Sequence, residues 1–267
     1  MIRDITIGQY YKADSVIHRL DPRVKLMGTL IFIISLFMGM NIWIYAVVTV
    51  ALAVVIKMSR IPLKFMVRGL KSIVILIIIS AVFNLFLTPG DVFIQIWKLT
   101  ITYQGLKMAI FMVVRLIYLI VGTSLMTLTT TPNNLTDGLE KGLGFLKVIK
   151  VPVHEIAMMM SIALRFIPIL IEETDKIMKA QMARGADFEN GSLIKRAKAM
   201  VPILVPLFVS AFRRANELAM AMEARCYHGS EGRTKMKPLK YEKRDRIAYI
   251  SMVLYLGVII IVKIIVA

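Results

Sequence analysis

The sequence predicts an all-α, polytopic membrane protein, and three observations lead to this fold class. Apolar residues make up 58% of the 267 positions and the mean hydropathy is +0.72, values typical of an integral membrane protein. Several unbroken apolar runs are long enough to cross a bilayer as helices. Before the last run, residues 131–246 contain two long amphipathic patterns. We therefore expect about five transmembrane helices and a separate domain of two long crossed helices plus short helices.

The first apolar run, residues 24–56, is too long for one untilted span and short for two. Asp21 and Pro22 before it suit a helix N-cap and the first helical position. A hairpin near Met40 and Asn41 keeps the basic residues that follow on the same side as the N-terminus. These residues are Lys57, Arg60, Lys64, Arg68 and Lys71. We therefore predict two spans connected by a tight turn.

The later apolar runs predict three more spans. Residues 72–87 form the third, a turn follows at 88–91, residues 103–130 form the fourth and residues 247–266 form the fifth. The predicted domains are a membrane domain of four spans at 1–130, a cytoplasmic domain at 131–246 and a C-terminal transmembrane helix at 247–267.

Basic residues are distributed unevenly along the chain. In this topology 30 of the 34 Lys and Arg residues lie on the side of the N-terminus. Because positive charge accumulates on the cytoplasmic side, we expect a multi-pass membrane protein with an uncleaved, cytoplasmic N-terminus. The net charge of +17 therefore indicates membrane topology rather than nucleic-acid binding. The single cysteine, Cys226, cannot form an internal disulfide.

Few residues suit catalysis or metal binding. His18, His154 and His228 lie far apart in the sequence, and none has another histidine or a cysteine at helical spacing. No segment has the glycine and lysine spacing of a phosphate-binding loop. We expect no metal site and no cofactor.

Glu172, Glu173 and Asp175 form the densest acidic cluster. A membrane-embedded transferase could use such a cluster to hold Mg²⁺ and a diphosphate. Alternatively, these side chains form ion pairs at helical spacing with Lys176 and Lys179. Isolated acids elsewhere do not complete an active site, so the second interpretation is preferred.

Arg115 lies well inside the fourth predicted span, where a charged side chain is costly and often functional. We expect this intramembrane charge to have a structural role, with Asn84 or a backbone carbonyl as its partner across a helix interface.

The two long helical patterns of residues 131–246 end in the same way. One ends at Ala183, Arg184 and Gly185, and the other ends at Ala224, Arg225 and Cys226. Arginine near a helix C-terminus presents a planar group of donors that pairs with carboxylates. The small residues beside each arginine would let the backbone enter a groove on another protein.

Small residues also recur along both patterns, every four positions. They are Ala157 and Ser161 in the first and Ala211, Ala215 and Ala219 in the second. Such stripes let helix axes approach closely, so we predict that the helices cross there. Pro168 in one helix, and Pro202 and Pro206 in the other, predict kinks.

At these residues the chain resembles the transmembrane T component of energy-coupling factor (ECF) transporters, which take up vitamins and metals in prokaryotes. The matching segments are HRLDPRVK (18–25), RFIPILIEE (165–173), AQMARG (180–185) and AMEARC (221–226). The resemblance implies two crossed cytoplasmic coupling helices whose Arg184 and Arg225 ends dock into two ATPase subunits. It also implies a membrane-embedded S component that binds the substrate. Cys226 departs from the family pattern, in which glycine is more usual.

The resemblance implies a non-catalytic subunit of an importer. This importer would use ATP hydrolysis as the energy source for uptake of a vitamin or a transition metal such as cobalt or nickel. Two other function classes stay open: a membrane transferase that uses Glu172, Glu173 and Asp175, and a carrier that transports alone. The sequence does not identify the substrate, the number of S components or whether the two ATPases are identical.

Overall fold

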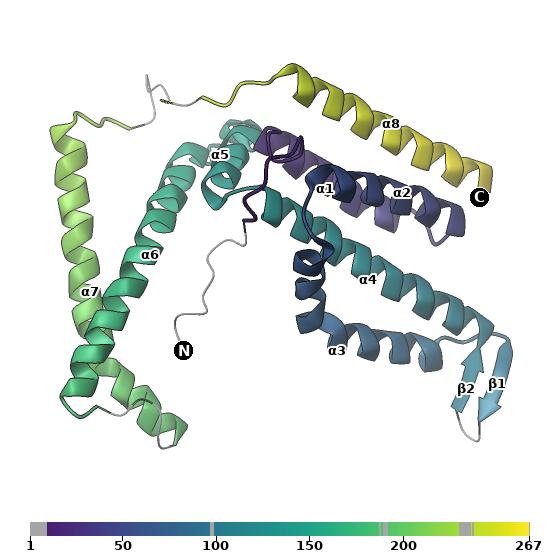
Figure 1. Cartoon of the computed structure of the whole chain (residues 1–267), viewed down its shortest axis with the longest axis horizontal. Coiled ribbons are helices and arrows are strands. Elements are labelled where there is room, and N and C mark those ends of the chain that lie inside the picture. Colours follow the sequence, from purple (N-terminus) through teal and green to yellow (C-terminus); the bar gives the residue numbers. More distant parts are fainter. Residues whose placement is uncertain are drawn as a thin grey trace. The chain divides into compact units, whose positions relative to one another are not determined.

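The structure, a computed structural model, describes residues 10–96, 99–186, 188, 192–229, 236 and 238–266. Figure 1 shows a chain built almost entirely of helices, which confirms the predicted all-α class. The elements in chain order are α1 (Pro22–Phe37), α2 (Ile42–Ser59), α3 (Leu63–Leu87), β1 (Val92–Ile96), β2 (Leu99–Thr102), α4 (Tyr103–Thr129), α5 (Pro132–Gly142), the 3₁₀ helix η2 (Gly144–Ile149), α6 (Val153–Ala183), α7 (Leu193–Ala224) and α8 (Lys243–Val266).

The chain divides into two compact units. The bundle unit comprises Gly8–Gly138 and Leu239–Ala267, and the described part of the insertion unit comprises Leu139–Pro238. The bundle unit therefore contains α1 to α4, most of α5, and α8. The insertion unit contains the end of α5, η2 and the two longest helices, α6 and α7. The predicted division into membrane and cytoplasmic domains concerns location and stays a prediction.

The predicted hairpin between α1 and α2 is present in the bundle unit. Asp21 is the N-cap of α1 and its carboxylate accepts a hydrogen bond from the Arg23 backbone N–H, with Pro22 as the first helical residue. Asn41 caps α2 by accepting a hydrogen bond from the Trp43 backbone N–H. Each cap satisfies a donor that the helix leaves unpaired, so the two helices are separate elements.

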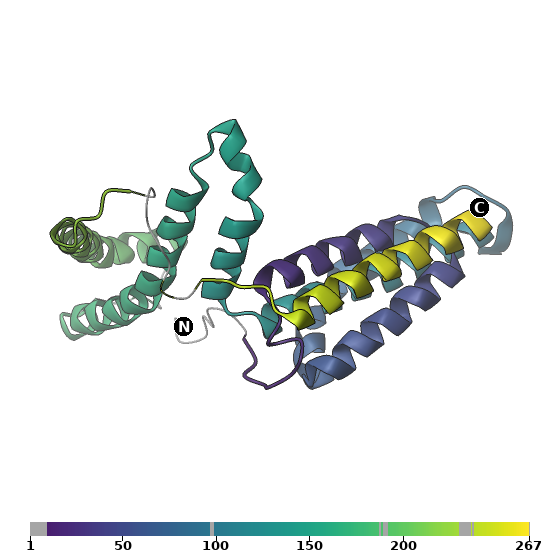
Figure 2. The same ribbon diagram turned by 90° about the horizontal axis from the view of Figure 1, so that it is seen from above.

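Apolar side chains from several helices form the core of the bundle unit. One cluster of buried residues comprises Ile17, Leu52, Ile61, Met66, Val121, Leu125 and Leu128. A second comprises Leu36, Ile44, Tyr45, Val48 and Ile259. Figure 2 shows α8 lying alongside α1, although the two helices are far apart in the sequence.

The structure describes a longer, bent helix around the predicted third span, and its apolar part Ile73–Leu87 matches the predicted residues 72–87. Helix α3 begins at Leu63 rather than near residue 72, and its parts Leu63–Lys71 and Ile73–Leu87 meet at 64°. Lys64, Arg68 and Lys71 therefore lie in the first part of a bent helix and not in a loop. A bend lets the basic part and the apolar part of one helix lie in different surroundings.

A short antiparallel hairpin follows the predicted turn at residues 88–91. Strands β1 and β2 pair with Ile94 opposite Ile101 and Ile96 opposite Leu99. This hairpin was not predicted, and it is the exception to the all-α class in the described part of the chain. Tyr103, at the start of α4, donates its backbone N–H to the Asp91 carbonyl at 3.0 Å, which closes the connection.

Several helices are long and apolar enough to cross a membrane. Four satisfy that test as single helices: Ile42–Ser59, Tyr103–Thr129, Val153–Ala183 and Lys243–Ile265. The bent helix α3 brings the number to five. Helix α1, with 16 residues, is shorter than these. Because α6 satisfies the test by length and composition, its predicted location outside the membrane stays a prediction.

The insertion unit is dominated by α6, with 31 residues, and α7, with 32. The two helices contact one another, and Figure 1 shows α7 bending along its length. Pro202 and Pro206 lie inside α7 and Pro168 lies inside α6. An internal proline removes a backbone hydrogen bond and clashes with the preceding turn, which accounts for the bend in α7.

Candidate functional site

The C-terminal end of α6 is closed by a Schellman motif centred on Gly185. The Gly185 N–H donates to the Met182 carbonyl and the Ala186 N–H donates to the Gln181 carbonyl, both at 3.0 Å. Gly185 has φ of 88°, in the left-handed region. Arg184 is therefore the C-cap residue, because the chain reverses immediately after it.

The C-terminal end of α7 has the same motif with a different residue at its centre. The Cys226 N–H donates to the Glu223 carbonyl at 2.8 Å and the Tyr227 N–H donates to the Met222 carbonyl at 3.1 Å. Cys226 takes φ of 54°. The replacement of glycine by cysteine therefore preserves the cap geometry, which the sequence alone left uncertain.

A cysteine in the left-handed conformation is strained, because its Cβ lies close to the backbone. A hydrogen bond of 2.7 Å between His228 Nδ1 and the Cys226 carbonyl oxygen holds the turn after α7. Around Gly185 no atom lies within 4 Å of the position that a Cβ would occupy. The two helix ends thus share one cap geometry, but the left-handed conformation costs more conformational free energy at Cys226 than at Gly185.

Both cap arginines are exposed. Within the described part of the chain, the guanidinium groups of Arg184 and Arg225 form no hydrogen bond or ion pair. The neighbouring residues Ala183, Gly185, Ala224 and Cys226 are exposed as well. Each helix therefore ends in a narrow, exposed tip with an arginine whose donors are available to another molecule.

An ion pair joins α6 and α7 between these tips. Arg214 on α7 donates from Nη2 to Glu173 Oε2 on α6 at 2.6 Å. This bond holds the pKa of the Glu173 carboxyl below its usual range. Glu173 was predicted to pair with Lys176 or Lys179 on its own helix, and its nearer partner is instead on the facing helix.

The ion pair lies at equivalent positions on the two helices. Arg184 follows Glu173 by 11 residues, and Arg225 follows Arg214 by the same 11 residues. Along an α-helix this is about 16 Å from the ion pair to each cap. The two helices thus have arms of equal length between their contact and their arginine tips.

The predicted stripes of small residues differ in exposure. Ala157 is buried and Ala211 is half-buried, whereas Ser161, Ala215 and Ala219 are exposed. The Ser161 hydroxyl donates to the Ala157 carbonyl of its own helix at 2.9 Å. The role of these residues in helix crossing stays a prediction.

An exposed apolar face runs along α7 and was not singled out from the sequence. Its members follow the i, i+3, i+4, i+7, i+8, i+11 pattern of one helix face and are all more than half exposed: Val201, Leu204, Val205, Phe208, Val209 and Phe212. The rings of Phe208 and Phe212 lie 4.7 Å apart. We call these six residues the α7 apolar face. An exposed apolar face of this kind marks a site of contact with another protein or with a membrane.

The bundle unit, by contrast, contains buried charges. Arg115 is buried, and its Nε donates to the Tyr45 hydroxyl at 3.0 Å, with the guanidinium carbon 5.0 Å from the centre of the Phe37 ring. Asn84 instead donates to the Ser80 carbonyl of its own helix. The predicted structural partner of Arg115 was therefore wrong. An aromatic pair replaces it and compensates the cation within the span.

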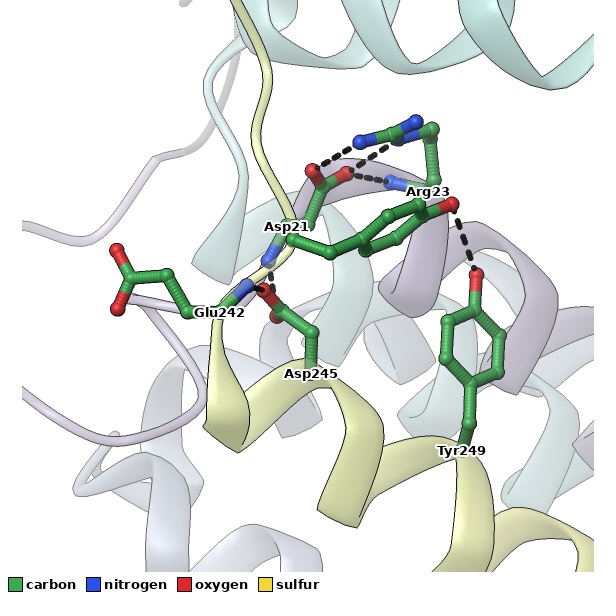
Figure 3. A network of polar contacts seen from close by, with 6 residues as sticks. Asp21, Arg23, Glu242, Asp245 and Tyr249 are labelled. Atoms are coloured by element: carbon green, nitrogen blue, oxygen red, sulfur yellow. Dashed lines mark hydrogen bonds and ion pairs between the residues drawn. The ribbon is translucent and has the colours of Figure 1, made fainter.

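Figure 3 shows a polar network at the first turns of α1 and α8, which the sequence did not predict. Asp245 accepts the Asp21 N–H at 2.9 Å through one carboxylate oxygen and the Glu242 N–H at 2.8 Å through the other. Arg23 donates to the Asp21 carboxylate from Nε at 3.0 Å and from Nη2 at 2.8 Å. The Arg23 guanidinium also lies 3.8 Å from the centre of the Tyr241 ring.

The network sets the ionisation of Asp21. Burial raises the pKa of this carboxyl, but the hydrogen bonds from Arg23 act in the opposite direction, and the pKa lies below its usual value. The ionised Asp21 lies at the N-terminus of α1, where negative charge is favourable.

Lys25, in the same turn of α1, holds the end of α4. Its buried Nζ donates to the Thr129 carbonyl at 2.8 Å and to the His18 carbonyl at 3.1 Å. The Tyr11 N–H donates to the adjacent Leu128 carbonyl at 2.9 Å. A cation at a helix C-terminus complements the carbonyls that have no partner within the helix.

The three histidines lie in separate surroundings, and the described residues contain no group of three His, Cys, Asp or Glu residues able to hold a metal ion. His18 lies between Ser15 and the Tyr11 carbonyl. His154 Nδ1 lies 2.9 Å from a Glu140 carboxylate oxygen. His228 bonds to the turn after α7.

Comparisons with known proteins place these features in a family. A family model described as cobalt transport protein (CbiQ) matches residues 13–236, a range that contains both helix tips. The energy-coupling factor transporter transmembrane protein EcfT of Clostridium kluyveri is 57% identical over 250 residues, 93% of each chain. Proteins of the same name from Thermosediminibacter oceani and Bacillus subtilis are 56% and 47% identical over 250 and 254 residues. The match to the Thermosediminibacter oceani protein covers 94% of both chains. The match to the Bacillus subtilis protein covers 95% of this chain and 96% of the relative.

Proposed function

Because the chain belongs to the cobalt transport protein (CbiQ) family and, with its EcfT relatives, to the transmembrane T components of ECF transporters, we propose that it is the coupling subunit of such an importer. In this role it carries the ATP-driven motion of two ATPase subunits to a membrane-embedded S component, which binds a vitamin or a transition metal. The subunit itself is non-catalytic and takes no cofactor.

The matched arginine tips are the observation that carries this proposal. Arg184 and Arg225 cap two long helices through the same Schellman geometry and expose their guanidinium groups. A planar guanidinium at a narrow helix end suits a groove that contains a carboxylate. Each tip, with the small residues on either side of its arginine, is the proposed docking element for one ATPase.

The ion pair between Glu173 and Arg214 supports two equivalent docking positions. The contact lies 11 residues before each cap arginine, so a displacement of either tip acts through an arm of the same length. Small residues at 157, 161, 211, 215 and 219 are the proposed helix-crossing positions. The pairing of Glu173 with Arg214 also argues against a transferase site at Glu172, Glu173 and Asp175.

The α7 apolar face is the proposed contact for the S component. It exposes branched aliphatic and aromatic side chains on a helix that contacts α6, the second proposed coupling helix. Hydrophobic side chains at this spacing suit another helix surface. Substrate specificity then belongs to the S component, and neither the substrate nor the identity of the ATPases follows from this chain.

We place the N-terminus and the insertion unit in the cytoplasm. In this topology α1, α2, α3, α4 and α8 cross the membrane, and α6 lies outside it although its composition would allow a span. Cysteines introduced at Asn41 and Pro89 in a Cys226→Gly background should react with an impermeant thiol reagent from outside. A cysteine at Phe145 should not, and its labelling from outside would contradict the cytoplasmic location of this unit.

The experiment that tests the coupling role is copurification of the ATPases with Arg184→Ala, Arg225→Ala and the double variant at matched expression. If each arginine meets a buried carboxylate, its loss weakens the contact by roughly 2 to 5 kcal/mol, partly because the carboxylate is left unpaired. The double variant should lose the ATPases and uptake while still inserting into the membrane. Replacement by lysine should rescue poorly, because a point charge does not reproduce the planar donor group. Normal assembly and uptake in the double variant would return both residues to ordinary helix caps.

A further inference from the structure

Two chain connections join the insertion unit to the bundle unit among the described residues. The first leaves the bundle unit at Gly138 and the second returns to it at Leu239. Within the described residues, movement of the insertion unit that reaches the bundle unit through the chain passes these two places. The bundle-unit residues that contact the two connections therefore determine how such movement is transmitted to the bundle unit.

The outgoing connection lies against the first turn of α1. A Cβ added at Gly138 would lie 2.8 Å from Pro22 Cβ and 3.3 Å from the Pro22 carbonyl carbon. Only a glycine allows the backbone of α5 to approach this closely. Just before α5, Lys25 fixes the end of α4 through the Thr129 carbonyl.

The returning connection lies against the same turn. Arg23 stacks on the ring of Tyr241, two residues after Leu239, and Asp245 joins the Asp21 backbone to the start of α8 (Figure 3). The carboxylate of Asp245 serves both helices at once, because its second oxygen accepts the Glu242 N–H. The outgoing and returning connections thus contact consecutive residues, Pro22 and Arg23.

The charges that hold this turn are removed from solvent. Asp21, Lys25 and Asp245 are 7%, 9% and 2% exposed. Burying ionised groups is costly unless each is paired and hydrogen-bonded, and removing one partner is strongly destabilising. The arrangement is therefore stiff, in contrast to an exposed loop attachment.

We infer that the first turn of α1, residues 21–25, is a single hinge point at which both connections of the insertion unit are fixed to the bundle unit. Two connections held at adjacent residues act as one joint, so movement of the insertion unit enters the bundle unit at this one place. Asp21, Lys25, Gly138 and Asp245 are positioning residues in this joint. The inference rests on the proposed function, since it states where ATP-driven movement enters the membrane helices.

The sharpest test compares two glycines of the same helix, α5. Gly138→Ala places a methyl group against Pro22, whereas around Gly142 no atom lies within 4 Å of the new Cβ. Both substitutions raise helix propensity equally, so the contact with Pro22 is the difference between them. In proteoliposomes with the complete transporter, we expect Gly138→Ala to lower substrate uptake per ATP hydrolysed about tenfold, because the added methyl group forces the backbone of α5 away from Pro22. Gly142→Ala should leave this ratio unchanged.

A second pair of variants tests the polar part of the joint. Asp245→Ala removes the acceptor shared by α1 and α8, and Asp14→Asn removes an exposed ion pair with Arg19 in the preceding segment. Asp245→Ala should retain the ATPases and their hydrolysis but lose coupled uptake. Asp14→Asn should retain all three.

If Asp245→Ala does not fold, flexible insertions test the same idea without opening the network. A Gly-Ser-Gly insertion after Gly142 and another after Pro238 leave every joint contact in place but make both connections flexible. We expect uptake per ATP hydrolysed to be lost although the ATPases copurify. Wild-type coupling in the insertion variant or in Gly138→Ala would overturn the hinge. Loss of the ATPases from these variants would also overturn the hinge. The coupling role itself is tested separately, by ATPase copurification and uptake in the Arg184 and Arg225 variants.

Discussion

The insertion unit and the bundle unit differ in where their hydrogen-bonded and unpaired charges lie. In the bundle unit, buried charges such as Arg115, Lys25 and Asp245 are hydrogen-bonded to groups of the same unit. In the insertion unit, the cap arginines are exposed and the α7 apolar face is uncovered. The proposed function accounts for this difference, because the cap arginines and the α7 apolar face are the proposed contacts of the insertion unit with other proteins.

The largest expected effect tests whether the α7 apolar face needs a partner. Phe208→Ser and Phe212→Ser remove rings that would be buried on docking, and each loss should cost about 2 kcal/mol, or roughly 30-fold in affinity. We expect the double variant to lose the S component in copurification while the ATPases remain. Phe145→Ser, which removes an exposed ring on η2, is the control and should retain all partners.

If the S component stays bound to the Phe208 and Phe212 double variant, the apolar face is not its docking surface. A loss of expression instead of a loss of binding would mean that the insertion unit uses these rings for its own folding. Either result would remove the contrast between the two units, because contact with the S component is what would cover the exposed α7 apolar face.

The next effect concerns the contact between the two long helices. Glu173→Arg places two like charges at the partly exposed crossing, and Arg214→Glu does the same with opposite sign. Each single variant should reduce uptake several-fold without releasing the ATPases. The exchanged pair, Glu173→Arg with Arg214→Glu, should recover most of the activity, because it restores an attractive pair at the same place. Equal loss in the exchanged pair and the single variants would show that the ion pair does not hold the arms.

Local patterns predicted much of this architecture. The α1 and α2 hairpin followed from the basic residues after Ile56, and the helix tips followed from the repeated Ala-Arg sequence. Such signals lie within one helix or one turn, where spacing determines geometry. The β1 and β2 hairpin was missed although residues 92–102 contain β-branched and aromatic residues typical of strands.

Contacts between distant residues could not be predicted from such patterns. Asp21 and Asp245 are 224 positions apart, and no periodicity connects them. Several polar side chains could have paired with Arg115, and packing rather than spacing selects Tyr45. The pairing of Glu173 with Arg214 had a usable signal, because both lie 11 residues before their cap arginines. Sequence proximity favoured Lys176 and Lys179 instead.

A smaller effect compares the two helix tips within the insertion unit. Cys226→Gly should relieve the strain of a left-handed residue and stabilise the α7 cap by roughly 1 kcal/mol. Gly185→Ala should destabilise the α6 cap by a similar amount, about 1 kcal/mol. Hydrogen exchange of the cap amides, at Tyr227 and Ala186, measures both changes. Slower exchange at Ala186 in Gly185→Ala would contradict the strain argument.

The smallest effect lies in the bundle unit and concerns pH. Burial lowers the pKa of His18, the hydrogen bond to the Tyr11 carbonyl raises it, and the charge of Lys25 lowers it again, with a net decrease. The folded state therefore favours the neutral ring, with Nε2–H donating to Tyr11 and Nδ1 accepting from the Ser15 hydroxyl. Because the pKa is lower in the folded state, this contribution to stability is present above the usual histidine pKa of about 6.5.

As the pH falls below this value, His18 binds a proton more readily in the unfolded state, and the stabilisation is lost as the pH reaches the lower folded-state pKa. We expect the melting temperature of the purified protein to fall slightly between pH 7.5 and about pH 5.5. His18→Gln should remove part of that dependence, since glutamine does not titrate but can still donate to the Tyr11 carbonyl. His228→Gln, at an exposed turn of the insertion unit, is the matched control and should keep the full pH dependence. An unchanged pH profile in His18→Gln would show that acid weakens the bundle unit elsewhere.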